Sequence, residues 1–178
     1  AAFMSMSAPP SVGQPTRKQI LLAQVVWALL IVFVLIGAVW HGVSGEVLGR
    51  IWHNLIERPG GPMTFRFILQ PIMATVAAGL AGVRDARIGR TAYLWTILSD
   101  PAQRLPRLQE GMVATARIIL LGLVMDSIYQ VLVFETFHPA EAALVSLLLA
   151  FVPYLMLRGP IARLAAWWFN RRATGPSR

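Results

Sequence analysis

The sequence predicts an all-α integral membrane protein, a four-helix bundle of transmembrane helices with amphipathic helices at the membrane surface. Of its 178 residues, 56% are hydrophobic and 13% are charged, and the mean hydropathy is +0.60. Soluble domains carry about 25% charged residues, so this composition excludes an ordinary soluble domain. The positions of four apolar runs and of the arginines indicate how many helices cross the membrane and in which direction.

The first apolar run has no charge from Gln19 to Gly45. It exceeds the roughly 20 residues that a helix needs to cross the hydrocarbon core. Arg17 and Lys18 precede it as in a signal sequence, but no small-residue cleavage site closes it, so it is interpreted as a signal anchor spanning 20–41. The residues before it are rich in Ser, Pro, Gly and Met, and segment 1–19 is predicted to be a flexible cytoplasmic N-terminus.

Three further apolar runs follow. Segment 67–83 is uncharged, 118–134 is interrupted only by Asp126, and 142–157 is again uncharged. With flanking residues that reach the interfaces, we expect spans at 65–84, 112–134 and 140–158, all in one transmembrane domain of residues 20–158. In the connection before the third span, Ser99-Asp100-Pro101 is typical of a helix start. That connection is either a solvated linker or a docking surface.

The basic residues indicate the orientation. The side that would hold both termini carries 12 of the 16 Lys and Arg residues: Arg17, Lys18, Arg84, Arg87, Arg90, Arg104, Arg107, Arg158, Arg163, Arg171, Arg172 and Arg178. The other side has Arg50, Arg58 and Arg66, and Arg117 lies inside the third span. Positively charged loops stay cytoplasmic, which predicts a multi-pass protein of a bacterial inner membrane with both termini inside. This placement also explains the net charge of +8 without a nucleic-acid partner.

Two segments have the pattern of amphipathic surface helices. Apolar residues repeat at helical spacing over 46–57, on the predicted outer side. After the fourth span, Gly159-Pro160 is predicted to break the helix, and 159–178 then forms a cytoplasmic amphipathic tail. Such a tail is attracted to the anionic lipids of the inner leaflet. The arginines expected to contact lipid headgroups are Arg117, Arg158, Arg163, Arg171 and Arg172.

Asp126 is the most unusual residue of the spans, because a carboxylate inside a membrane is costly and is often functional. Tyr129 and Gln130 lie three and four residues later, hence on the same helix face. Gln70, near the outer end of the second span, is expected at a similar depth. The four residues define a predicted polar site, either a hydrogen-bonded packing contact or a site that handles protons or cations.

Small residues in the second span predict close helix packing. Ala74, Ala78 and Gly82 recur at four-residue intervals, the spacing that lets helix backbones approach. This face packs either against another span of the same chain or against a partner subunit.

All three histidines map to the predicted outer side. His41 and His138, with Glu135 and Glu141, are weak candidates for a metal or haem site. The stretch around Pro139 is equally typical of a helix start with Glu141 in its first turn, so we expect no metal and no cofactor.

Four strings resemble those of small, uncharacterised bacterial inner-membrane proteins: FRFILQPIMA at 65–74, GVRDAR at 82–87, MDSIYQ at 125–130 and PYLMLRGP at 153–160. The resemblance covers roughly 62–168. It implies a membrane protein of this class and no particular activity, substrate or cofactor.

No phosphate loop, nucleophile elbow or paired-cysteine motif occurs, and the chain has no cysteine. We therefore expect a non-enzymatic membrane subunit or scaffold that acts through helix contacts in a homo-oligomer or a larger membrane complex. The alternative is a small oligomeric transporter or channel that couples to protons or cations through Asp126. An intramembrane enzyme acting on lipid is the third possibility.

Overall fold

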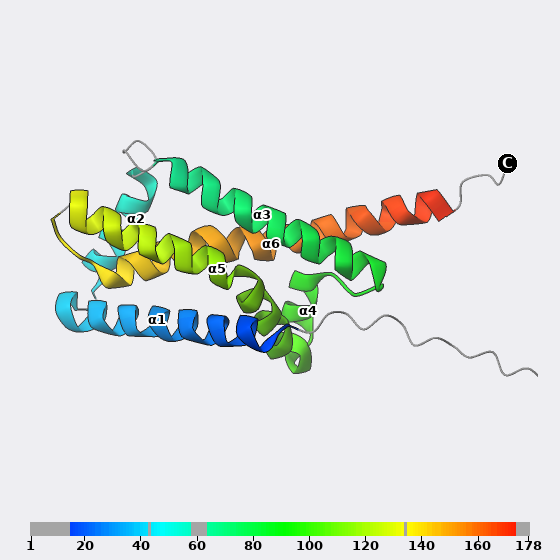
Figure 1. Cartoon of the computed structure of the whole chain (residues 1–178), viewed down its shortest axis with the longest axis horizontal. Helices are drawn as coiled ribbons and strands as arrows, with labels where there is room; N and C mark the ends of the chain where they lie inside the picture. Colours follow the sequence, from blue (N-terminus) through cyan, green and yellow to red (C-terminus); the bar gives the residue numbers. More distant parts are fainter. Residues whose placement is uncertain (1–14, 43, 58–63, 134, 174–178) are drawn as a thin grey trace, which may run out of the picture.

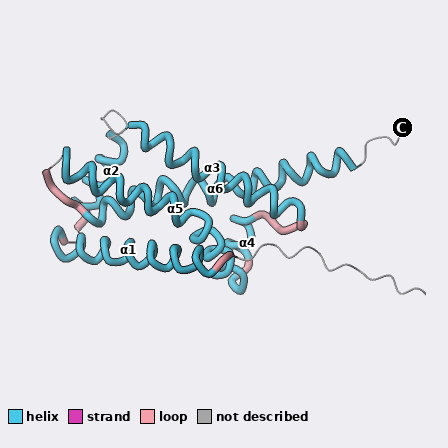
Figure 2. The backbone as a smooth tube through the Cα atoms, viewed as in Figure 1, coloured by secondary structure: helices cyan, strands magenta, loops and turns pink. Residues whose placement is uncertain are grey.

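The computed structural model describes residues 15–42, 44–57, 64–133 and 135–173. Over these residues the chain forms helices and short connections, with no strand. The helices are α1 (Arg17–His41), α2 (Gly45–Glu57), α3 (Thr64–Arg87), α4 (Tyr93–Ser99), α5 (Pro101–Val133) and α6 (Pro139–Ala173). Figures 1 and 2 show their arrangement. The predicted all-α class is confirmed.

Four of these helices, α1, α3, α5 and α6, are long and apolar enough to cross a membrane. They correspond to the four predicted spans. The amphipathic segment 46–57 is also helical, as α2. α1 begins at Arg17, inside the segment predicted to be flexible, because the Thr16 N–H donates to the Gln19 side chain at 3.0 Å and caps the helix start. Residues 1–14 and 174–178 of the predicted termini lie outside the described residues.

The start of α5 confirms the helix predicted at Ser99-Asp100-Pro101. The Ala102 N–H donates to Asp100 Oδ1 at 3.0 Å, and Pro101 occupies the first helical position, where its missing N–H has no cost. The helix then runs without interruption to Val133, so it includes both the connection and the third span.

α6 differs from the prediction at Gly159-Pro160. No break occurs there, and one helix runs from Pro139 to Ala173. A proline inside a helix removes one backbone hydrogen bond, but here α3 supports the backbone. A Cβ on Gly82 would lie 2.8 Å from the Arg158 carbonyl oxygen and 3.1 Å from the Ala162 nitrogen, so the two helix backbones are in direct contact.

α6 is the central helix, in contact with α1, α3, α4 and α5. Its contact with α3 uses the small-residue face, where Ala74 and Ala78 are fully buried and Gly82 lies against α6. The predicted packing face thus lies inside the chain. On the other side of α6, small residues such as Ala142, Ala143 and Ala150 pack with α1 and α5 side chains into one apolar core.

Successive long helices run in opposite directions, so α1 and α5 point one way, α3 and α6 point the other way, and the bundle has two ends (Figure 1). At one end α1 and α5 begin and α3 finishes; we call it the Arg158 end. At the other end α6 begins and α1 and α5 finish; we call it the His138 end. Figure 1 shows α6 continuing past the bundle beyond the Arg158 end.

Candidate functional site

The most elaborate polar site is at the Arg158 end, between α3, α5 and α6. We call it the arginine–carboxylate cluster, and it comprises Asp85, Arg90, Arg107, Glu110 and Arg158. At its centre Arg158 Nε donates to Asp85 Oδ2 at 2.7 Å and Arg158 Nη2 donates to Asp85 Oδ1 at 3.0 Å. The two side chains are 4% and 2% exposed. This is a buried, bidentate ion pair between α3 and α6.

Glu110 of α5 links the buried Asp85–Arg158 ion pair to the solvent-exposed Arg90. Its Oε2 accepts from Arg158 Nη2 at 2.9 Å, and its Oε1 accepts from Arg90 Nη1 at 2.8 Å. Arg107 Nη1 lies 3.5 Å from the same Oε2 and 3.8 Å from Asp85 Oδ1. Three guanidinium groups therefore face two carboxylates, and three of the bundle's helices are connected through charge.

Two tyrosines complete the surroundings of Arg158. Its Nη1 donates to the Tyr154 hydroxyl at 2.9 Å, and its Cζ lies 4.1 Å from the centre of the Tyr93 ring. The Tyr93 hydroxyl donates to the Arg107 carbonyl oxygen. Burial raises the pKa of the Tyr93 phenol above its ordinary 10.0. A buried guanidinium needs such partners, since hydrogen bonds and ring contacts replace the water that it loses.

A glycine of α5, Gly111, leaves the space that these two aromatic rings occupy. The Tyr93 hydroxyl lies against Gly111 of α5, and the Tyr154 ring would be 3.3 Å from a Cβ at that position. Any larger residue there would push the two rings away from Arg158. Gly111 therefore allows α4 and α6 to bring their tyrosines to the charged groups.

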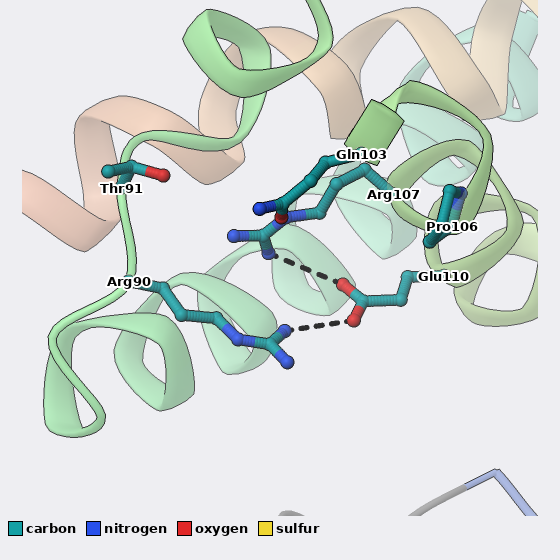
Figure 3. A pocket seen from close by; sticks show the side chains of 6 residues that line it. All are labelled: Arg90, Thr91, Gln103, Pro106, Arg107 and Glu110. Carbon is teal, nitrogen blue, oxygen red and sulfur yellow. Dashed lines mark hydrogen bonds and ion pairs between the residues drawn. The ribbon is translucent and has the colours of Figure 1, made fainter. Parts of the chain in front are cut away.

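A cleft of about 310 Å³ opens beside the cluster. Its lining residues come from the α3–α4 connection and the first turns of α5: Arg90, Thr91, Gln103, Pro106, Arg107 and Glu110. Figure 3 shows Arg90 and Arg107 approaching Glu110 from two sides. Arg90 and Glu110 are each more than a third exposed, whereas the Arg107 side chain is 6% exposed. The cleft is thus open to solvent, and one of its walls is a buried cation.

The predicted polar site around Asp126 lies toward the His138 end. Asp126, Tyr129, Gln130 and Gln70 are all buried. Gln130 Nε2 donates to Asp126 Oδ2 at 2.7 Å, and Gln130 Oε1 accepts from the His138 N–H at 2.6 Å. Gln130 therefore ties Asp126 to the start of α6.

Gln70 reaches the same region one helical turn away. Its Nε2 donates to the Ser146 carbonyl oxygen at 3.0 Å and to the Ile118 carbonyl oxygen at 3.4 Å. Its amide fits against Gly122, where a Cβ would collide with it. Gln70 Oε1 and Ser146 Oγ are buried and find no hydrogen-bond partner within the described part of the chain. Gln70 thus cross-links the backbones of α5 and α6 from α3.

The histidine candidates are only partly brought together. The His41 and His138 rings stack with their centres 4.5 Å apart and line an apolar cleft of about 180 Å³ between α1, α2 and α6. Glu141 is buried nearby, whereas Glu135 is exposed in the α5–α6 connection. Among the described residues, no three His, Cys, Asp or Glu side chains gather as metal ligands. The four candidate residues therefore do not form such a group in the structure.

The sequence predicts that Arg158 contacts lipid headgroups, and the structure corrects this prediction. Its guanidinium is buried and engaged by Asp85, Tyr154 and Glu110. Arg117, Arg163, Arg171 and Arg172 are exposed, and their contact with lipid stays a prediction. Two features of the sequence could have indicated this cluster. Asp85 is an acidic residue at an end of the bundle where basic residues dominate, and Tyr154 and Arg158 lie one helical turn apart on α6.

Chemically, the arginine–carboxylate cluster can hold helices in register and can recognise oxyanions, because guanidinium groups bind both carboxylate and phosphate.

Comparison with family models, with curated proteins and with solved structures finds no match to this chain.

Proposed function

We propose that this chain is a non-enzymatic subunit or scaffold of a bacterial inner membrane, with both termini in the cytoplasm, that acts through helix contacts with further copies or with a larger membrane complex. The observation that carries the proposal is the extension of α6 beyond the Arg158 end of the bundle (Figure 1).

The extension presents a bare apolar face. None of the residues from Arg163 to Arg172 is buried, and Leu164, Trp167 and Trp168 are 66%, 49% and 45% exposed. On the α3 side the helix is partly covered, since Arg87 lies over the Phe169 ring at 5.8 Å. Exposed aromatic and leucine side chains on one face of a helix are typical of a protein contact.

The continuity of α6 favours a protein partner over the membrane surface. A tail hinged at Gly159 would turn and lie flat on the lipid headgroups. Because α6 is helical through Gly159 and Pro160, the extension keeps the direction of the span and carries its tryptophans away from the bundle. Arg171 and Arg172 stack on Trp167 and Trp168 at 4.0 and 3.6 Å, which orders this face.

Size-exclusion chromatography with light scattering in a mild detergent tests the proposal. We expect a homo-oligomer or a stable co-purifying complex, and we expect Leu164→Ala with Trp168→Ala to weaken it. The matched control is Leu35→Ala on α1, a leucine of similar exposure (59%), which should leave the assembly intact. A monodisperse monomer without a partner would argue against the proposal. A photo-crosslinker at position 164 that captures only lipid would instead assign the extension to the membrane surface.

A second candidate function rests on the buried carboxyl groups near the His138 end. Asp126 and Glu141 are 0% and 2% exposed. Intramembrane carboxylates in hydrogen-bonded surroundings serve proton and cation coupling in transporters. In proteoliposomes with an imposed gradient, wild type should then move protons or cations, Asp126→Asn should be inactive, and Glu135→Gln, a change at an exposed carboxylate, should remain active. A wild type that moves neither under any gradient eliminates this candidate.

A further inference from the structure

Arg107 is buried at the wall of the cleft but is only loosely engaged by other groups. Its side chain is 6% exposed, and its ion pairs within the described part of the chain measure 3.5 Å to Glu110 and 3.8 Å to Asp85. Good charge-assisted hydrogen bonds are about 2.7–2.9 Å long. Arg158, by contrast, donates from three nitrogens at 2.7 to 3.0 Å. Arg107 therefore has donor capacity left for a further anion.

Glu110 occupies the place where such an anion would bind. Three arginines converge on its single carboxylate, which is 38% exposed at the cleft. Arg158 has a second carboxylate partner in Asp85, whereas Arg90 and Arg107 depend mainly on Glu110. Figure 3 shows Arg90 and Arg107 each facing a different oxygen of this carboxylate. Glu110 thus resembles an internal ligand that an external oxyanion can replace.

The cleft has the size and lining for this purpose. Its volume of about 310 Å³ is at the lower end of ligand pockets, which range over roughly 300–1,000 Å³. Gln103 adds an amide donor at the rim. Guanidinium forks match the oxygens of a phosphate group in the same bidentate way as they match a carboxylate.

We propose that this cleft binds a phosphate group between Arg90 and Arg107, with Glu110 as a displaceable internal competitor. The phosphate belongs either to an anionic lipid headgroup, which the position at one end of the spans would supply, or to a free phosphate ion. This inference does not depend on the subunit proposal, because it concerns a different surface from the α6 extension.

The experiment has two arms. Detergent-purified protein is titrated with inorganic phosphate and with pyrophosphate, and the midpoint of thermal unfolding is followed. Protein in nanodiscs of phosphatidylcholine, with and without phosphatidylglycerol, is examined in the same way. Protection by the free anions indicates a phosphate ion, and protection by phosphatidylglycerol alone indicates a lipid headgroup.

Four variants decide whether the cleft is the site. Arg90→Gln and Arg107→Gln should each weaken the binding about tenfold, since each removes a charge-assisted contact. Glu110→Gln should strengthen it about tenfold, because the competing carboxylate is gone. Arg84→Gln is the matched control: Arg84 is exposed at the end of α3 and does not line the cleft, so the affinity should be unchanged.

The proposal is overturned if neither free anion nor phosphatidylglycerol protects wild type, or if Arg84→Gln lowers the affinity as much as Arg90→Gln does. It is also overturned if Glu110→Gln binds no better than wild type. Arg107 is buried, and if its variant does not fold, the exposed Arg90 and Glu110 still give a decisive comparison.

Discussion

Asp85 and Arg158 show how much one pair of side chains contributes to this fold. The pair is buried and bidentate, and its two members come from α3 and α6. Removing one member of a buried pair costs about 3–5 kcal/mol when it leaves the other charge unpaired. In Asp85→Ala the Arg158 guanidinium loses its bidentate partner but keeps Glu110 at 2.9 Å, so the loss measured in unfolding by sodium dodecyl sulfate should lie toward the lower end of this range.

The neighbouring exposed arginine provides the control for this prediction. Arg84→Ala should change the free energy of unfolding by less than about 0.5 kcal/mol. The double variant Asp85→Ala with Arg158→Met should recover part of the loss, since the buried guanidinium that loses its bidentate partner is removed as well. If the double variant is as unstable as the sum of the single variants, the two residues are not coupled.

Tyr93 predicts a loss of stability at alkaline pH. Burial raises the pKa of its phenol above 10.0, so above that pH the unfolded chain loses this proton while the folded chain keeps it. The unfolded state then binds fewer protons, and the free energy of unfolding falls as the pH rises. The free energy of unfolding should therefore be measured between pH 8 and about 11. Its decrease with pH should be smaller in Tyr93→Phe, which also starts from a lower stability because it lacks the hydrogen bond to the Arg107 carbonyl oxygen.

At the scale of helices, glycines set the distance between neighbours. Gly122 of α5 faces the Gln70 amide of α3. In Gly122→Ala the new methyl group should displace this amide and its bond to the Ser146 carbonyl, at a cost of about 1–3 kcal/mol in the same unfolding assay. Gly79→Ala is the matched control, because nothing lies within 4 Å of the added methyl group. Equal losses in both variants would mean that helix contact at Gly122 is unimportant.

The helices themselves were largely predictable, and their ends were less so. Apolar runs located α1, α3, α5 and α6, and helical spacing located α2. The predicted end of the fourth span is wrong. Gly159-Pro160 locally favours a helix break, but packing of the α6 backbone against Gly82, 77 positions before Gly159, keeps the helix continuous. A contact between distant segments cannot be inferred from the local pattern.

The polar site around Asp126 was predictable from the sequence, whereas the arginine–carboxylate cluster was not. Asp126 and Gln130 were found because four-residue spacing places them on one helix face, and the structure joins them at 2.7 Å. The arginine–carboxylate cluster was missed because its members come from three helices, and charges that flank apolar runs look alike whether they meet lipid or one another. Only the packing of α3, α5 and α6 distinguishes Arg158 from Arg163.

For the whole molecule, the orientation is the most direct prediction. The chain has no cysteine, so single cysteines report access without background. In intact cells a membrane-impermeant maleimide should label Ser44→Cys, at the predicted outer side, and should leave Ser99→Cys unlabelled until the membrane is opened; both positions are exposed. Labelling of Ser99→Cys in intact cells would reverse the orientation.

The α3–α6 ion pair also has a consequence for the order of synthesis. Asp85 and Arg158 are 73 residues apart in sequence, and α6 leaves the ribosome after α3, α4 and α5. α3 has the lowest mean hydropathy of the four candidate spans, 1.4 against 2.8 for α1. The least hydrophobic candidate span therefore receives its charge partner and its closest backbone neighbour only after α4, α5 and most of α6 have been synthesised, so α3 cannot complete its packing helix by helix as the chain emerges.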